Sequence, residues 1–326
     1  MMQGYTYEGA VDCTQLAKVE HLKGKTAIVT GGKILILQPW KELALRSHIQ
    51  KGCNGLGEAY VRALVAIGVC IGDPDKERGI KIEQELNGTK FIRCDVTKWE
   101  EQVRLFEEAV AFSETGKISH VIANAGIHRP DDIFLYSGNH EEPKEPDLSV
   151  IDVNIKGTLY TAKLAAHHFI RQNGAGGLPE QDDTSLVLIG SGAAFLDCPR
   201  APQYSGSKWA MRGIMHSLRR TAFYYGSRVN VISPWYVKTN ILSDNDFKHV
   251  SSVGVKFAET EDASQCLLRI LGDERVNGHS FFVSGKKWAS NGYLDLDLED
   301  YPNNPLIREI QEDQMKSAPV DLGLFV

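Results

Sequence analysis

Several features that would place this 326-residue chain in a specialised class are missing from it. No apolar run approaches the roughly 20 residues that a membrane-spanning helix needs, and the first residues, MMQGYTYEGAVDCTQ, lack the charged and then apolar layout of a signal peptide. The six cysteines are scattered, without CxxC or metal-ligand spacing. We therefore predict reduced thiols, no metal site, no membrane partner and a cytoplasmic location.

An excess of positive charge is absent too. The formal net charge is −6, which gives no basic field for nucleic acid or acidic lipid. The chain is 42% hydrophobic and 24% charged, as is usual for a soluble globular protein. A chain of this length can bury one large α/β core. We expect a small-molecule substrate and no nucleic-acid partner.

Strand-like and helix-like patterns alternate along the chain. This alternation predicts an α/β fold, namely a single Rossmann-type, doubly wound parallel sheet of about seven strands flanked by helices. Strands are expected at Thr26–Thr30, Val69–Gly72, Lys90–Cys94, His120–Ala123, Ser185–Ile189, Arg228–Ser233 and Ser280–Val283. Helices are expected at Glu58–Ile67, Lys76–Leu86, Lys98–Phe112, Leu148–Gln172, Gln203–Tyr225 and Asp262–Leu271.

The pattern divides the chain into three parts. Residues 1–24 form an N-terminal extension, and residues 25–285 form the Rossmann-type domain, with an insertion at 33–52 in its first loop. Residues 286–326 form an acidic tail, rich in Asp, Glu and Pro, which we expect to pack along the surface.

One stretch near the N-terminus reads as a nucleotide-binding loop cut in two. Thr30-Gly31-Gly32 follows the first strand, and Asn54-Gly55-Leu56-Gly57 opens the first helix. If Lys33–Gly52 is left out, the glycines have the TGxxxGxG spacing. In such a loop, backbone N–H groups and the positive end of a helix hold a pyrophosphate. Two unrelated groups of turn glycines are the alternative interpretation.

We predict that Lys33–Gly52 is foreign to the fold. Its KILILQ segment is apolar and β-prone, and with Trp40 it makes a poor surface loop. A retained intron is the preferred explanation, because both ends permit splice dinucleotides and excision leaves TGGCNGLG. A lid over the cofactor, helical from Lys41 to Ile49, is the alternative.

Two further positions suit a dinucleotide. Asp73, at the end of the second strand, can accept hydrogen bonds from the adenosine ribose and repel a 2′-phosphate, which favours NAD over NADP. Asp75 is a competing candidate, and a simple turn aspartate before Pro74 is a third interpretation. Asn124-Ala125-Gly126 follows the strand HVIA, where small residues let a flat cofactor ring approach.

The strongest motif is Ser191, followed thirteen residues later by Tyr204 and then by Lys208. Tyr204 and Lys208 are four residues apart at the start of a helix, so they share one face. A nearby ammonium stabilises phenolate and lowers the pKa of a tyrosine, as a tyrosine general base requires. Ser191, at the end of a strand, can hydrogen-bond the substrate oxygen.

Together these motifs resemble the short-chain dehydrogenase/reductase family from about Lys25 to Val283. The likeness is closest to NAD-dependent 15-hydroxyprostaglandin dehydrogenases and fungal 5′-hydroxyaverantin dehydrogenase-like enzymes. It implies a catalytic tetrad of Asn154, Ser191, Tyr204 and Lys208. It also implies cofactor contacts at Thr30, Gly31, Gly32, Asn54, Gly55, Leu56, Gly57, Asp73, Asp95, Val96, Asn124, Ala125, Gly126, Tyr204, Lys208, Val237 and Thr239.

The family's Pro-Gly after the sixth strand is Pro234-Trp235 in this chain. We interpret Trp235 and Tyr236 as walls near the nicotinamide, and with Phe195 they suggest a bulky apolar substrate. Core packing is the alternative role for Trp235. The two long helices are where the family pairs its subunits, so the resemblance implies a homodimer or homotetramer.

Two functions follow as predictions. The first is an oxidoreductase that interconverts a secondary alcohol and a ketone with NAD, NADP being the less favoured cofactor. Such an enzyme suits fungal secondary (polyketide) metabolism. The second is a family member whose interrupted cofactor loop makes it catalytically impaired, a non-catalytic or misprocessed product.

Overall fold

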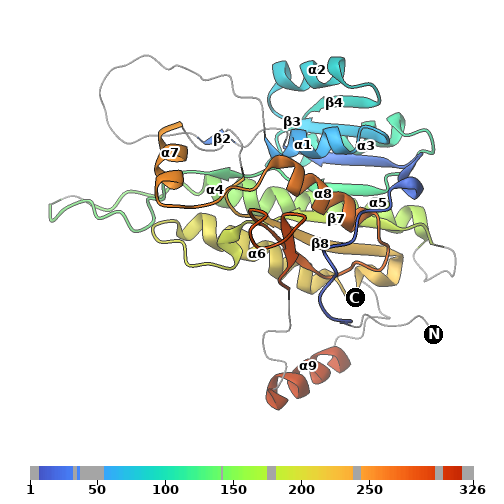
Figure 1. Cartoon of the computed structure of the whole chain (residues 1–326). Coiled ribbons are helices and arrows are strands. Elements are labelled where there is room, and N and C mark those ends of the chain that lie inside the picture. The colour runs from blue at the N-terminus through green and yellow to red at the C-terminus, as the bar shows by residue number, and fades with distance from the viewer. Residues whose placement is uncertain are drawn as a thin grey trace.

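The computed structural model describes residues 7–31, 35–36, 55–140, 142–174, 181–237, 244–297 and 304–317. Its centre is an eight-stranded sheet with the order β10-β9-β8-β7-β5-β1-β3-β4 (Figure 1). The strands are β1 Thr26–Thr30, β3 Gly68–Asp73, β4 Thr89–Arg93, β5 His120–Ala123, β7 Thr184–Ile189, β8 Ser227–Pro234, β9 Ser280–Val283 and β10 Tyr293–Asp295.

The predicted fold class is confirmed. Every pair of neighbouring strands is parallel except β9 and β10. The sheet has one strand more than expected, because Tyr293–Asp295, from the segment assigned to the tail, pairs with β9. The inner strands β1, β5, β7 and β8 are buried along their whole length. Burial on both faces is why β1, β5 and β7 are mostly apolar rather than alternating.

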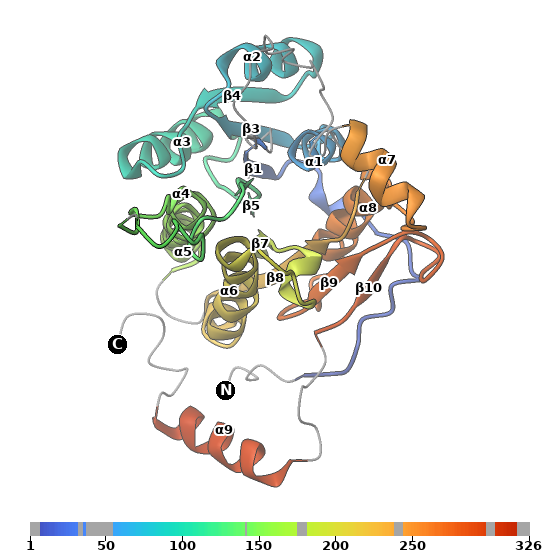
Figure 2. The same ribbon diagram turned by 90° about the vertical axis from the view of Figure 1, so that its left-hand side faces the viewer.

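Helices cover both faces of the sheet (Figure 2). One apolar cluster joins α1 and α8 to the sheet, and a second joins α3, α5 and α6 to the opposite face. The bounds are α1 Leu56–Ala63, α2 Lys76–Glu85, α3 Trp99–Phe112, α5 Thr158–Asn173, α6 Pro202–Leu218 and α8 Thr260–Leu271. Two further helices, α7 Asp244–Ser252 and α9 Pro305–Ser317, follow β8 and β10 in the chain.

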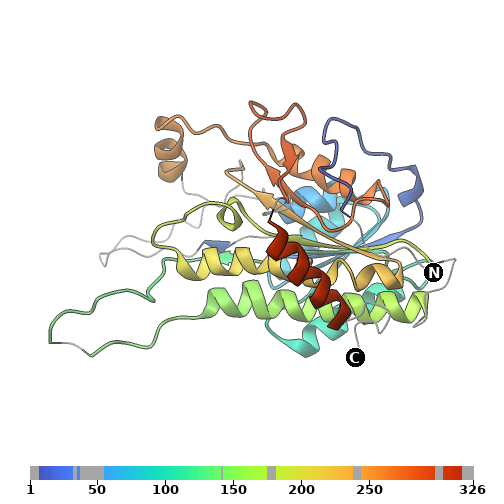
Figure 3. The same ribbon diagram turned by 90° about the horizontal axis from the view of Figure 1, so that it is seen from below.

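The two long helices differ from their predictions. The helix expected at Leu148–Gln172 consists of α4 (Ser149–Ile151), a π-helical turn over Asp152–Gly157 and then α5. The helix expected at Gln203–Tyr225 ends at Leu218, because the chain tightens into a 3-10 turn and reverses toward β8 at Gly226, whose φ is 71°. Figure 3 shows α5 and α6 running side by side.

Of the insertion at 33–52, the structure describes only β2, Leu35–Ile36. It pairs in parallel with β6, Ile127–His128, which directly follows the Asn124-Ala125-Gly126 turn. The remainder of the insertion, and with it the choice between intron and lid, lies outside the described residues. Within the described ranges, no helix has the length and apolar character to cross a membrane.

The chain on both sides of the Rossmann-type domain packs onto it. In the N-terminal segment, Val11 N donates to Asp295 Oδ2 at 2.9 Å. In the C-terminal segment, the nearly inaccessible carboxylate of Asp297 forms ion pairs at 3.2 Å with Arg212 of α6 and with Arg219, the residue directly after α6. His216 Nε2 lies 3.0 Å from the same carboxylate. The segment after β10 is thus tied to α6.

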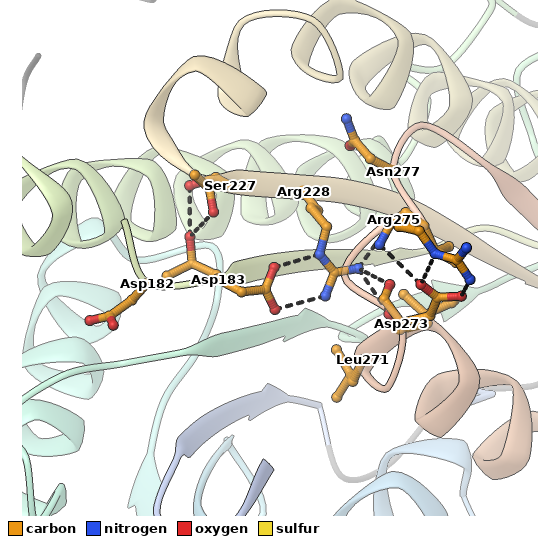
Figure 4. A network of polar contacts seen from close by, with 12 residues as sticks. Asp182, Asp183, Ser227, Arg228, Leu271, Asp273, Arg275 and Asn277 are labelled. Carbon is orange, nitrogen blue, oxygen red and sulfur yellow. Dashed lines mark hydrogen bonds and ion pairs between the residues drawn. The ribbon is translucent and has the colours of Figure 1, made fainter. Parts of the chain in front are cut away.

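A buried arginine organises the end of the sheet where β7 and β8 begin (Figure 4). Arg228 makes two hydrogen bonds to Asp183, at 2.6 and 2.9 Å. Its Nη1 also donates to the backbone oxygens of Ile270, Asp273 and Val276. These bonds satisfy carbonyls around the C-terminus of α8 that have no partner within the helix. The opposite ends of β7 and β8 carry the site.

Candidate active site

Eight of the predicted site residues line a cavity at the carboxyl ends of the parallel strands. The chain passes from β1 to β3 on one side and later adds β5 on the other, and such a switch in strand order is where open α/β sheets bind ligands. The cavity is lined by Leu56, Asn124, Gly126, Ile127, Ile189, Gly190, Ser191, Tyr204, Lys208, Pro234, Trp235 and Val237.

The first half of the interrupted loop is locked to the Asn124-Ala125-Gly126 turn. Gly31 has a φ of 72°, and a Cβ there would lie 2.4 Å from the Cα of Ala125, so no other residue fits without movement. Asn124 Nδ2 donates to the backbone oxygen of Thr30 at 3.1 Å and also to that of Gly31. The turn and the glycines therefore form one rigid edge of the cavity.

The second half of the loop suits a phosphate. Gly55 is the N-cap of α1 and supplies no side chain to bond the first N–H groups of the helix, which leaves them for an anion. Asn124 Oδ1 is buried and has no partner among the described residues. The uncapped start of α1 and the Oδ1 of Asn124, which lacks a partner among the described residues, fit a bound dinucleotide at two points of the rim. Gly32 and Asn54 lie outside the described residues.

The three acidic residues predicted near the adenosine end of the cofactor accept different hydrogen bonds. Asp73 is 4% exposed and accepts a hydrogen bond from Asp75 N at 2.7 Å. Asp75 caps α2 by accepting from Arg78 N at 3.1 Å. Asp95 accepts from both the backbone and the hydroxyl of Thr97. Of the three, Asp73 lies at the end of β3, one strand away from the glycines that follow β1.

Ser191, Tyr204 and Lys208 come together as the motif predicts. Ser191 follows β7 and lines the cavity together with Tyr204, while Tyr204 and Lys208 lie in the first turns of α6, a helix that starts with Pro202. Lys208 is 6% exposed, and its Nζ donates to the backbone oxygen of Ile189 at 2.9 Å. That Nζ is 5.7 Å from the centre of the Tyr204 ring.

The electrostatics depart from the prediction. Burial raises the pKa of Tyr204, and the hydrogen bond from Ser191 lowers it only in part. Burial also lowers the pKa of Lys208 to about 8. We expected the ammonium to hold the pKa of the tyrosine down. In this structure desolvation dominates the pKa of Tyr204, and Lys208 donates its Nζ to a backbone carbonyl and not to the phenol.

Asn154 lies in the π-helical turn and is 1% exposed. Its Oδ1 accepts from Ile127 N at 2.8 Å, and its Nδ2 donates to Ile127 O and Ser207 Oγ, each at 3.0 Å. A π turn inserts one residue into a helix and often marks a functional position. Here it carries an asparagine that ties β6 to α6.

Aromatic rings form one wall beside Ser191. Their centroids are 5.6 Å apart for Phe195 and Phe282, 6.5 Å for Phe282 and Trp235, and 4.5 Å for Trp235 and Tyr236. The indole of Trp235 occupies the space over Gly192, where a Cβ would lie 2.3 Å from its Cε3. The predicted wall residues therefore lie together, although Trp235 also packs against its neighbours.

Four further predicted contacts have different positions. Val237 lines the cavity, and Leu56 does so from the first turn of α1. Val96 packs on Gly157 of the π turn, where a Cβ would lie 2.8 Å from its Cγ2. Thr239 lies outside the described residues.

Sequence reasoning missed two residues next to the tetrad. The His128 ring lies 4.8 Å from the Tyr204 ring, centroid to centroid, and Asp131 Oδ2 accepts from Gln203 N at 2.7 Å at the start of α6. The only available signal was their position, just after the Asn124-Ala125-Gly126 turn. No motif marks either one.

Comparison with known proteins agrees with this geometry. Residues 49–248 match the family described as short chain dehydrogenase, and the chain belongs to that family. It is 29% identical over 301 residues to the 5'-hydroxyaverantin dehydrogenase of Dothistroma septosporum, covering 86% of this chain and 89% of that protein. It is 28% identical over 292 residues to the NADP-dependent dehydrogenase M3 of a Phoma species, covering 86% and 80%.

A solved structure has the same fold. The 3-ketoacyl-(acyl-carrier-protein) reductase from Brucella melitensis, complexed with NADH, superposes with a TM-score of 0.63 at 20% identity, covering 81% of this chain and 98% of that one. Family membership makes this protein an oxidoreductase that acts on CH–OH groups with a nicotinamide cofactor. The predicted family resemblance and enzyme class are confirmed.

Proposed function

We propose that this protein interconverts a secondary alcohol and a ketone on a bulky, apolar substrate, with NAD as the preferred cofactor. The observation that carries the proposal is that Ser191, Tyr204 and Lys208 line one cavity with Trp235. The cavity thus brings the proton-transfer groups and the indole of Trp235 together, and the rings of Tyr236 and Phe282 lie next to that indole.

The roles follow from the contacts. Tyr204 exchanges a proton with the substrate oxygen, and Ser191, which lines the same cavity, holds that oxygen. Lys208 supplies the positive charge that lowers the pKa of the phenol once its Nζ leaves Ile189 O. Asn154 supports the return of the proton to solvent. The nicotinamide, when bound, accepts or donates the hydride.

The cofactor would extend from the Tyr204 end of the cavity to the N-terminus of α1. Gly31 and Gly55 would face its pyrophosphate, and Asn124, Ala125 and Gly126 would face the ring system. Asp73 would accept the adenosine ribose hydroxyls and disfavour a 2′-phosphate. NADP is the competing cofactor, because one relative is named as NADP-dependent.

The aromatic wall supports a large, flat substrate. The rings from Phe195 to Tyr236 are in successive contact, and rings bury more apolar area than any other side chains. The fungal dehydrogenase among the relatives supports a role in polyketide secondary metabolism. We further propose a homodimer or homotetramer paired through α5 and α6.

The alternative, an impaired member of the family, concerns the insertion, most of which lies outside the described residues. It stays a prediction. One experiment separates the active dehydrogenase from the impaired family member. The full chain is titrated with NADH and NADPH while nicotinamide fluorescence is followed, and then assayed with 1-(2-naphthyl)ethanol and 2-acetonaphthone as bulky probes.

We expect NADH to bind more tightly than NADPH, and turnover of at least one probe. No binding of either cofactor would favour the impaired alternative. Tighter binding of NADPH would overturn the assignment of Asp73 and leave the reaction class intact.

A further inference from the structure

The imidazole of His128 is in direct contact with the ring of Tyr204. The ring centroids are 4.8 Å apart, and the planes meet at 85°, an edge-to-face arrangement. Burial lowers the pKa of His128, although Asp131 nearby raises it in part, so the ring is neutral at pH 7. Edge-to-face pairs of rings are favourable beyond the area that they bury.

The segment that carries His128 is fixed at both ends. At one end, Asn154 bonds both the N–H and the carbonyl of Ile127, at 2.8 and 3.0 Å. At the other end, Asp131 Oδ2 accepts from Gln203 N at 2.7 Å and so caps the start of α6. Gln203 directly precedes Tyr204 in the chain. His128 lies between these two anchors.

We propose that His128 is a positioning residue for Tyr204, and that its ring, fixed by the segment Ile127–Asp131, holds the phenol in one orientation. The polar contacts of Tyr204 do not achieve this alone. Ser191 lines the cavity with Tyr204 and lowers the pKa of its phenol, but Lys208 Nζ bonds Ile189 O. A lateral ring contact limits rotation of the side chain. The importance of this orientation for catalysis rests on the proposed function.

The test begins with crystal structures of the full-length wild type and of His128→Phe and His128→Ala. Phenylalanine keeps a flat ring at position 128 without its nitrogens, and alanine removes the ring. We expect one Tyr204 rotamer in the wild type and in His128→Phe, and more than one, or a shifted one, in His128→Ala. A single unmoved Tyr204 rotamer in His128→Ala would overturn the proposal. If that variant does not fold, His128→Leu takes its place and is judged by the same criterion.

Kinetics with 1-(2-naphthyl)ethanol and NAD test the consequence. A misplacement of about 1 Å can cost on the order of 100-fold in rate. We expect kcat to fall by about 10- to 100-fold in His128→Ala, with the KM for NAD unchanged, and to recover in His128→Phe. An equal loss in both variants would overturn the proposal, because it would mean that the nitrogens act on the substrate. The crystallographic result stands even if no alcohol is turned over, so failure of the proposed function is recognised separately.

His168 provides a matched control. It is also a partly buried histidine that stacks on an aromatic ring, with 5.3 Å between its centroid and that of Phe106. Burial lowers its pKa as well, to about 4. It lies in α5, outside the cavity lining. His168→Ala should lower the melting temperature and leave kcat unchanged. A drop in kcat as large as that of His128→Ala would show that loss of any packed ring is enough, and would overturn the specific role of His128.

Discussion

Replacing Arg228 with methionine tests how strongly one buried network holds the sheet together. The Arg228 side chain is 3% exposed and that of Asp183 is 10% exposed. Their pair is bidentate, and three backbone carbonyls complete the set of partners. Removing one partner of a buried ion pair costs about 3–5 kcal/mol, and Asp183 would keep only a long ion pair with Lys25, at 3.9 Å. We expect a loss of that size in the free energy of unfolding.

Urea unfolding at pH 7, followed by tryptophan fluorescence, measures this loss. Arg275→Met is the control, because Arg275 also pairs with an aspartate, Asp273, but its side chain is 81% exposed. Surface pairs contribute about 0–1 kcal/mol. The double variant Arg228→Met/Asp183→Asn should be more stable than Arg228→Met, because it removes the stranded charge. A loss for Arg228→Met no larger than that for Arg275→Met would refute the reasoning.

The effect of Arg228→Met should also depend on pH. Burial raises the pKa of Asp183, but the hydrogen bond with Arg228 and the charge of Arg228 together lower this pKa by more than burial raises it. The pKa of Asp183 in the folded protein therefore lies below its usual value. A depressed carboxyl pKa gives stability that is present above about pH 4 and is lost as the pH falls through the folded value. The difference between wild type and Arg228→Met should therefore shrink in acid.

Four other outcomes are expected. Tyr204→Phe should lower kcat by at least about 10²–10⁴-fold, the range of general acid–base steps, with an unchanged melting temperature; near-normal turnover would contradict the assignment. Asp73→Ala should narrow the ratio of the NADH and NADPH dissociation constants, and an unchanged ratio would place the carboxylate elsewhere. Deleting Lys33–Gly52 should tighten NADH binding, because the phosphate-binding N–H groups then converge; tighter binding by the full chain would favour the lid. Lys208→Met should raise the urea midpoint at pH 7, because burial disfavours the charged ammonium and lowers the pKa of Lys208 to about 8. The gain in stability should fade as the pH rises from about 8 to about 10.5. In that range the unfolded wild type binds more protons than the folded wild type, so the stability of the wild type rises with pH.

The inner strands β1, β5 and β7 were predictable because each is a mostly apolar run that is buried on both faces. Thr26–Thr30, His120–Ala123 and Ser280–Val283 have the predicted bounds. The π turn at Asp152–Gly157 could not be read, since one extra residue hardly disturbs the apolar spacing of a long helix. β10 was missed because a three-residue strand in an acidic segment depends on its partner, not on its own sequence.

At the site, the sequence revealed which residues form the motif. It did not reveal the direction of the Lys208 side chain or the neighbours of Tyr204. Ser191, Tyr204 and Lys208 follow from spacing on a strand and a helix. The direction in which Lys208 points depends on the carbonyl of Ile189, which only the folded sheet brings within reach. The contact of His128 with Tyr204 arises because β6 ends beside the start of α6, and such tertiary neighbours leave no pattern in the chain.

The contact between Trp235 and Gly192 constrains the order in which substitutions at these two positions can be accepted. A methyl group at 192 would lie 2.3 Å from the indole, so alanine there is compatible with a small residue at 235 but not with tryptophan. Residues in contact show non-additive effects. A lineage that acquired Trp235 needed glycine at 192 beforehand, and it now cannot replace Gly192 without first giving up the indole and the aromatic wall that the indole completes.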